Sequence, residues 1–108
     1  MPASRCLLDP DMAHDAALLT RWAMVTPEVA RIWFFGSRVR GTHEPDSDLD
    51  VAVEQDGSEY WGVNQEAWRE LLSPLTRLPL DLWTYRPGAD TRLDGAIAAN
   101  GLLIYERK

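Results

Sequence analysis

Two aspartates separated by one residue, Asp48 and Asp50, follow a glycine–serine pair, Gly36 and Ser37, after an interval of ten residues. On an extended strand, side chains two residues apart leave the same face, about 6.6 Å apart along the chain. Both carboxylates can therefore face one ligand. Glycine lets the backbone approach a ligand closely, and a serine offers a hydroxyl and an N–H group to a phosphate. The two pairs together predict a site for a ligand that carries phosphate.

A third acid, Asp81, stands in the apolar run Leu80–Trp83. If its strand is adjacent, about 4.8 Å to the side, three carboxylates converge. Three anions this close repel one another unless cations lie among them, and hard oxygen ligands select Mg²⁺ or Mn²⁺. We therefore predict that Asp48, Asp50 and Asp81 bind a divalent metal and that the site performs phosphoryl or nucleotidyl transfer. A salt bridge from Asp81 to a nearby arginine is the structural alternative, since an unpaired charge there costs several kcal/mol.

Two other phosphate- or metal-binding patterns do not fit. Asp46, Asp48 and Asp50 resemble the first ligands of a calcium-binding loop, but the sixth position is Val51 rather than glycine and the twelfth is Gly57 rather than glutamate. The segment 36–41 is not a P-loop, because no lysine followed by serine or threonine comes after it.

The composition indicates one folded domain over residues 1–108, with 45% hydrophobic residues and a net charge of −6. Seven of the seventeen acids lie between Glu44 and Glu59, and this argues against a general nucleic-acid binder, which needs a basic face. The single cysteine, Cys6, cannot form an internal disulfide, and the sequence has neither a membrane-spanning run nor a signal peptide. We expect a soluble cytoplasmic protein.

The apolar pattern predicts an α/β fold in which a small mixed sheet of three or four strands is flanked by helices. A first helix is capped by Asp9 and Pro10 and carries the apolar stripe Leu18, Leu19, Trp22 and Val25. The other expected elements are a strand 29–35 buried on both faces, a turn or helix start 37–41, a strand 48–54, a helix of about 58–72, a strand 80–85, a helix from 90 or 91 to its cap at Gly101, and a short edge strand 102–105.

The faces of these elements follow from their periodicity. In the strand 48–54, Leu49, Val51 and Val53 face the core, while Asp48, Asp50 and Ala52 face the other way. The residues expected to face inward from the later helices are Trp61, Ala67, Trp68, Leu71 and Leu72, and then Leu93, Ala96 and Ile97.

The segment 36–41, followed by 47–53, resembles the minimal nucleotidyltransferases (MNT) of the DNA polymerase β superfamily, in which a Gly-Ser pair precedes two aspartates at this spacing. Asp81 matches the third carboxylate of that family, and 97–105 resembles its closing helix and strand. The resemblance runs from Trp22 to Tyr105 and implies a polymerase β-like nucleotidyltransferase core.

The resemblance also implies roles for individual residues. Asp48 and Asp50 would hold the Mg²⁺ on the nucleotide phosphates, and together with Asp81 they would hold a second Mg²⁺ that activates the attacking hydroxyl. Asp81 is the candidate to accept the hydroxyl proton. The residues expected to bind the nucleotide are Gly36, Ser37, Arg38, Arg40 and Ser47. For the two arginines, a solvated turn or an acidic partner is the alternative.

Many members of this family are encoded beside a HEPN-domain toxin, which the MNT antitoxin silences by transferring AMP from ATP to a tyrosine. The resemblance therefore implies an antitoxin of this kind, with ATP as substrate and a HEPN toxin as partner. Transfer to a small molecule such as an aminoglycoside, and neutralisation of a partner by binding alone, are the alternatives. Trp33, Trp61 and Trp83 could stack an adenine, although a role in the core or in an interface competes with this interpretation.

Overall fold

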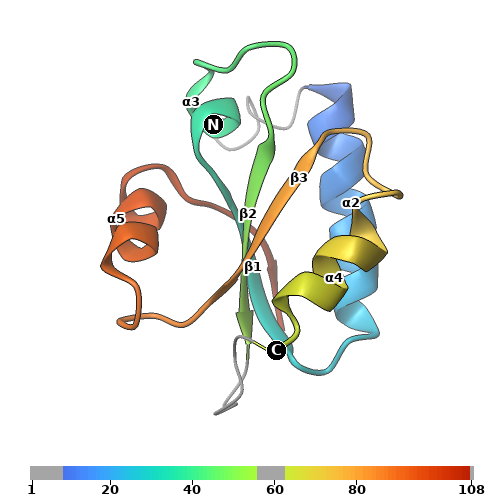
Figure 1. Cartoon of the computed structure of the whole chain (residues 1–108), viewed down its shortest axis with the longest axis vertical. Helices are drawn as coiled ribbons and strands as arrows, with labels where there is room; N and C mark the ends of the chain where they lie inside the picture. The colour runs from blue at the N-terminus through green and yellow to red at the C-terminus, as the bar shows by residue number, and fades with distance from the viewer. Residues whose placement is uncertain (1–8, 56–62, 108) are drawn as a thin grey trace.

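The computed structural model describes residues 9–55 and 63–107, which form a four-stranded mixed sheet with helices on both faces (Figure 1). The strand order is β3-β2-β1-β4. The strands are β1 (Val29–Phe35), β2 (Leu49–Gln55), β3 (Leu80–Tyr85) and β4 (Leu102–Glu106). Strands β2 and β3 are parallel, whereas β1 is antiparallel to both β2 and β4. The predicted α/β class with a small mixed sheet is confirmed, and β4 is an edge strand as expected.

The helices are α2 (Pro10–Met24), α3 (Ser37–Arg40), α4 (Gln65–Leu72) and α5 (Thr91–Asn100). Helices α2 and α4 cover one face of the sheet and α5 covers the other (Figure 1). In β2, Leu49, Val51 and Val53 join the core beneath α2 and α4, while Ala52 packs in the smaller cluster beneath α5. The predicted alternation of faces is therefore confirmed. No helix among the described residues is long and apolar enough to cross a membrane.

Helix α2 begins as the sequence predicts. The Asp9 side chain accepts hydrogen bonds from the backbone N–H groups of Asp11 (2.8 Å) and Met12 (3.3 Å), and Pro10 opens the helix. Leu19 is fully buried, but Val25 is 79% exposed because the helix has already ended at Met24.

An unexpected feature of α2 is the fully buried carboxylate of Asp15. It accepts hydrogen bonds from the backbone N–H groups of Arg77 (2.8 Å) and Leu78 (3.0 Å), which lie just before β3. The ring of His14 lies 2.9 Å from the same carboxylate. Asp15 thus fixes the position of the segment that leads to Asp81.

Helix α4 differs from its prediction at the start and on one face. Val63 and Asn64 form a turn, so the helix begins at Gln65, and the earlier part of the predicted helix, 58–62 with Trp61, lies outside the described residues. Trp68 and Leu72 are buried as expected. Ala67 and Leu71 are exposed, because each lies about 100° around the helix axis from the residue that follows it, Trp68 or Leu72, and these two face the sheet.

The start of β2 is also corrected by one residue. The strand begins at Leu49, whose N–H bonds the Pro79 carbonyl at 2.7 Å, and Asp48 is the last residue of the preceding loop. Asp48 therefore does not share the regular strand geometry that places Asp50.

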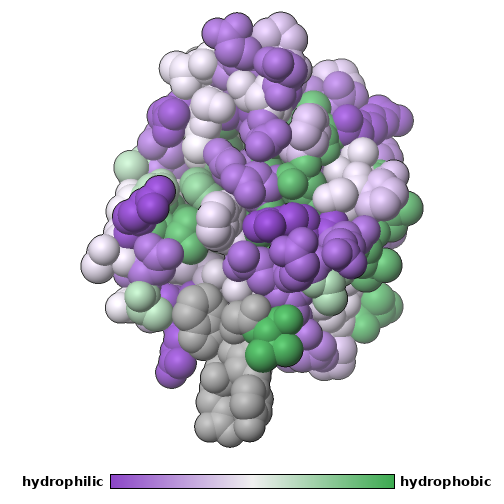
Figure 2. Space-filling model, in the orientation of Figure 1, coloured by the Kyte–Doolittle hydropathy of each residue, from purple (hydrophilic) through white to green (hydrophobic). Residues whose placement is uncertain are grey.

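Figure 2 shows a largely hydrophilic face on which hydrophobic side chains gather beside α4. The large hydrophobic residues that are exposed in the described part of the chain are Met24, Val25, Val63, Leu71, Leu75, Trp83 and Leu103. Of the described tryptophans only Trp83 is among them, since Trp22 and Trp68 pack edge to face at a centroid distance of 5.2 Å and Trp33 packs beneath α5.

Candidate active site

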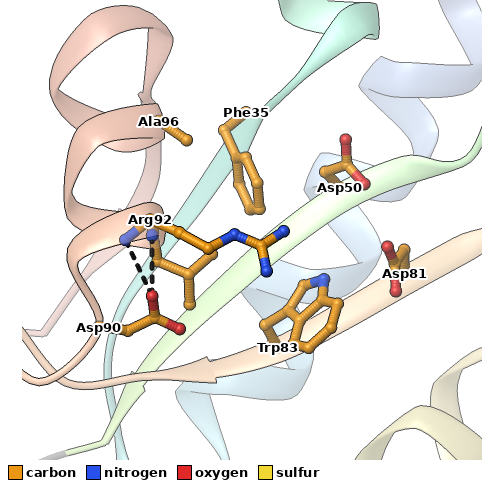
Figure 3. A pocket seen from close by; sticks show the side chains of 8 residues that line it. Phe35, Asp50, Asp81, Trp83, Asp90, Arg92 and Ala96 are labelled. Atoms are coloured by element: carbon orange, nitrogen blue, oxygen red, sulfur yellow. Dashed lines mark hydrogen bonds between the residues drawn. The ribbon is translucent and has the colours of Figure 1, made fainter.

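Asp50 and Asp81 are side by side, because they are register partners on the parallel strands β2 and β3. On its other side, Asp50 pairs with Phe35 of β1. Both carboxylates line one cavity on the face of the sheet that α5 covers (Figure 3). The predicted adjacency of these two acids is confirmed.

The electrostatics of the pair show how close the negative charges lie. Burial is the largest cause that raises the pKa of Asp50, followed by the charge and hydrogen bonding of Asp81 and by the charge of Asp48, and the pKa reaches about 6. The positive charge of Arg40 lowers the pKa of Asp50. Asp48 is exposed in the loop, but its charge still reaches Asp50. The site therefore favours a proton or a cation among its carboxylates.

The donor set fits Mg²⁺, since it consists of hard carboxylate oxygens with a charge that a divalent ion would neutralise. Among residues 9–55 and 63–107, no three His, Cys, Asp or Glu side chains already stand close enough to form a metal-binding group. The structure thus brings Asp50 and Asp81 together and leaves Asp48 beside them. The metal role of all three remains a prediction.

The turn at Gly36 lies directly against Asp50. Gly36 has φ 82° and ψ −159°, a conformation that is nearly restricted to glycine. A Cβ atom at this position would overlap the carboxylate of Asp50. The glycine is needed here for its conformation and for its lack of a side chain. It brings the start of α3, with Ser37, next to the acids.

The two predicted arginines occupy different environments. Arg38 is only 6% exposed, and its guanidinium donates to the carbonyls of Ser47 (2.9 Å) and Pro45 (3.1 Å). The Ser47 hydroxyl in turn accepts the N–H of Glu44 at 2.8 Å. Arg38 and Ser47 therefore hold the loop that ends at Asp48. Arg40 is exposed and close enough to influence Asp50, so it is the arginine better placed to meet a phosphate.

Arg69 of α4 is a residue of the site that the sequence did not single out. Its Nη2 donates to the Leu82 carbonyl at 2.7 Å and lies 3.9 Å from Asp81 Oδ1, and its guanidinium carbon is 5.7 Å from the centre of the Trp83 ring. The alternative ion pair for Asp81 therefore exists, although its contact is long. Arginine supplies ten of the eleven basic residues, so no single arginine stood out in the sequence.

The cavity itself also contains residues that were not predicted. Its volume is about 270 Å³. Its lining consists of Phe35, Asp50, Asp81, Trp83, Asp90, Arg92, Leu93 and Ala96. In Figure 3 the side chain of Arg92 extends from the start of α5 across the cavity, between the rings of Phe35 and Trp83. The site thus has an acidic side on β2 and β3 and an aromatic side that leads to α5.

The fold is that of a nucleotidyltransferase domain. The sequence profile of the family Polbeta, described as polymerase beta, nucleotidyltransferase, matches residues 19–108, and the chain belongs to this family.

Solved structures show the same fold at low sequence identity. A toxin–antitoxin crystal structure with AMP-PNP has a chain 23% identical to this one, with a TM-score of 0.66 over 87% of this chain and 73% of its own. An MntA–HepT toxin–antitoxin structure has a chain 18% identical, with a TM-score of 0.63 over 89% and 73%. A candidate nucleotidyltransferase from Sulfolobus solfataricus is 19% identical, with a TM-score of 0.62 over 99% and 89%. No curated protein matches the sequence significantly.

Proposed function

We propose that this chain transfers AMP from ATP to a tyrosine hydroxyl of a HEPN-domain toxin, in the presence of two Mg²⁺ ions, and that it acts as the cytoplasmic antitoxin of that toxin. The observation that carries the proposal is the Asp50–Asp81 pair in parallel register, with the Gly36 turn packed against Asp50. Family membership supports the nucleotidyl transfer. The folds of a toxin–antitoxin chain with AMP-PNP and of an MntA–HepT chain support the nucleotide and the partner.

The residues of the chain have distinct parts in this reaction. Gly36 and Ser37 bind the terminal phosphates, and Arg40 adds a positive charge beside them. When bound at Asp48, Asp50 and Asp81, Mg²⁺ neutralises phosphate charge and makes the acceptor hydroxyl more acidic.

The reaction is an in-line displacement at the α-phosphorus. The hydroxyl oxygen forms a bond to that phosphorus, and Asp81 accepts the hydroxyl proton. The bond from the α-phosphorus to the bridging oxygen breaks, and pyrophosphate leaves with the electron pair. Positioning and neutralisation of charge account for most of the catalysis.

The size of the cavity favours a protein acceptor over a small molecule. Sites for small ligands usually enclose about 300–1,000 Å³, whereas this cavity measures about 270 Å³ and must lie beside a bound nucleotide. It has room for one side chain of a partner, and a larger acceptor would have to extend beyond it.

The test is incubation with the product of the neighbouring gene, ATP and Mg²⁺, followed by intact-mass spectrometry. We expect the partner to gain one or more AMP units, and the double substitution Asp48→Asn/Asp50→Asn to abolish this gain. The matched control is Glu44→Gln/Asp46→Asn, which removes the same charge from exposed positions in the preceding loop and should leave transfer intact. A tight complex without a change in mass, with inhibition that survives the Asp48/Asp50 substitutions, would establish neutralisation by binding instead.

A further inference from the structure

The cavity lies on one definite side of the paired aspartates. Phe35, Asp50 and Asp81 are register partners across β1, β2 and β3, so the sheet places them in a row. Gly36 follows Phe35 and contacts Asp50 from the β1 side. The cavity includes Asp50 and Asp81 and extends to Trp83 and α5, but Gly36, Ser37 and Asp48 are not part of its lining. The expected phosphate turn and the cavity therefore meet the acids from different directions.

In nucleotidyl transfer the attacking and leaving oxygens lie roughly in line through the phosphorus. A pyrophosphate that leaves toward Gly36 and Ser37 requires a hydroxyl that arrives from the opposite side, where Asp81 and the cavity lie. We propose that the cavity between β3 and α5 is the acceptor subsite, and that it takes the aromatic ring of a tyrosine whose hydroxyl reaches Asp81. This inference rests on the proposed function and identifies where its acceptor binds.

The lining matches a ring with one polar end. Phe35 is 8% exposed and forms a fixed wall. Trp83 is 39% exposed, although the Arg69 guanidinium carbon lies 5.7 Å from the centre of its ring, and Leu93 and Ala96 of α5 add apolar atoms. Aromatic rings pack on one another in offset or edge-to-face geometry and gain about 0.5–1.5 kcal/mol beyond simple burial. A serine or threonine acceptor would leave this aromatic surface uncovered. A tyrosine covers it and still carries its hydroxyl to the carboxylates.

Arg92 supplies the second contact for the ring. The carboxylate of Asp90 is occupied as the cap of α5, where it accepts the N–H groups of Arg92 (3.0 Å) and Leu93 (3.2 Å). This cap fixes the first turn of α5, from which the Arg92 side chain crosses the cavity toward Asp50 and Asp81 (Figure 3). A planar guanidinium stacks on aromatic faces. Trp83 and Arg92 thus recognise the acceptor ring from β3 and from α5.

The test separates acceptor binding from nucleotide binding. Trp83→Ala and Arg92→Ala should each raise the KM for the acceptor protein at least tenfold, while the Kd for ATP with Mg²⁺, measured by calorimetry, stays within twofold of wild type. Trp83→Phe keeps an aromatic ring and should restore part of the lost acceptor affinity. Arg21→Ala, an exposed position of α2 on the opposite face of the sheet, is the matched control for charge.

The opposite pattern overturns the inference. If the Kd for ATP rises and the KM for the acceptor does not, the cavity holds the adenine instead. If neither changes, the cavity is not part of the site.

A second measurement keeps the inference testable if the wild-type chain transfers nothing and the proposed function fails. The indole N–H signal of Trp83, assigned in the NMR spectrum with Trp83→Phe, is followed with Mg²⁺ and a saturating non-hydrolysable ATP analogue present. N-acetyl-tyrosinamide should shift this signal, and N-acetyl-serinamide should not. A shift with adenosine alone, or no shift with the tyrosine compound, contradicts the assignment of this subsite.

Discussion

Replacement of Gly36 by alanine should damage the site more than it damages the fold. The backbone at Gly36 has φ 82° and ψ −159°, and a non-glycine residue in this region costs about 1–3 kcal/mol. In addition, the new Cβ would lie 2.9 Å from Cγ of Asp50 and closer still to its carboxylate oxygen. The carboxylate of Asp50 must therefore move away from its place beside Asp81.

Gly41→Ala is the matched control, because it contains the backbone strain without the collision. Gly41 has φ 78° and ψ 16°, and a Cβ atom there would meet nothing within 4 Å. Alanine in this left-handed conformation costs about 1–2 kcal/mol. Both variants should lose free energy of unfolding in urea, and Gly36→Ala should lose more.

Binding of ATP with Mg²⁺ distinguishes the two variants. We expect Gly36→Ala to bind at least tenfold more weakly than wild type, because Asp50 is displaced, and Gly41→Ala to bind within about threefold of wild type. Calorimetry on variants shown to be folded by circular dichroism gives both values. Equal affinity of the two variants would refute the reasoning, since the contact between Gly36 and Asp50 would then have no part in ligand binding.

Three further predictions concern the metal, the acids and the fold. Binding of ATP should require a divalent ion, and at a hundredfold excess over Kd it should stabilise the chain by about 2.7 kcal/mol; calorimetry that gives equal affinity in chelator would contradict this. The folded-state pKa of Asp50, about 6, lies above its unfolded value, so in chelator its ionisation lowers the free energy of unfolding as pH rises from about 4 to about 6. Asp50→Asn should remove this loss, which is at most about 3 kcal/mol and smaller after solvent screening. If urea titrations above about pH 6 give the variant and the wild type the same free energy of unfolding, the prediction is wrong. Asp15→Ala leaves the buried N–H groups of Arg77 and Leu78 without their acceptor and should cost about 3 kcal/mol of unfolding free energy; a change below about 1 kcal/mol would show that water replaces the carboxylate.

The strands were predictable because their ends have local causes. The apolar runs 29–35 and 80–85 end at Gly36 and before Pro87, and the structure places β1 and β3 on the same residues. The expectation that Asp81 lies beside Asp50 depended on a pairing of β3 with β2 that no local pattern specifies. In the structure, the parallel pairing of β2 with β3 places Asp81 opposite Asp50.

Residues that act through tertiary contacts were harder to identify. Arg69 and Arg92 gain their importance only when α4 and α5 pack beside β3, and in the sequence they are two arginines among ten. The helical spacing gave a weak indication that Asp15 is buried, since it lies three residues after Met12 and four before Leu19 on the buried face of α2. Its partners, the N–H groups before β3, are more than sixty residues away and could not be predicted.

The outer edge of β3 restricts how a partner can reach Asp81. Strand β3 is at the end of the sheet, where unpaired backbone groups usually invite another strand. Here the Leu82 carbonyl accepts Nη2 of Arg69 at 2.7 Å, and the Thr84 N–H donates to Oε1 of Gln65 at 2.9 Å. Because side chains of α4 already bond these groups, a partner cannot extend the sheet there without displacing them. The face between β3 and α5, where Asp81 borders the cavity, is reached without breaking these bonds.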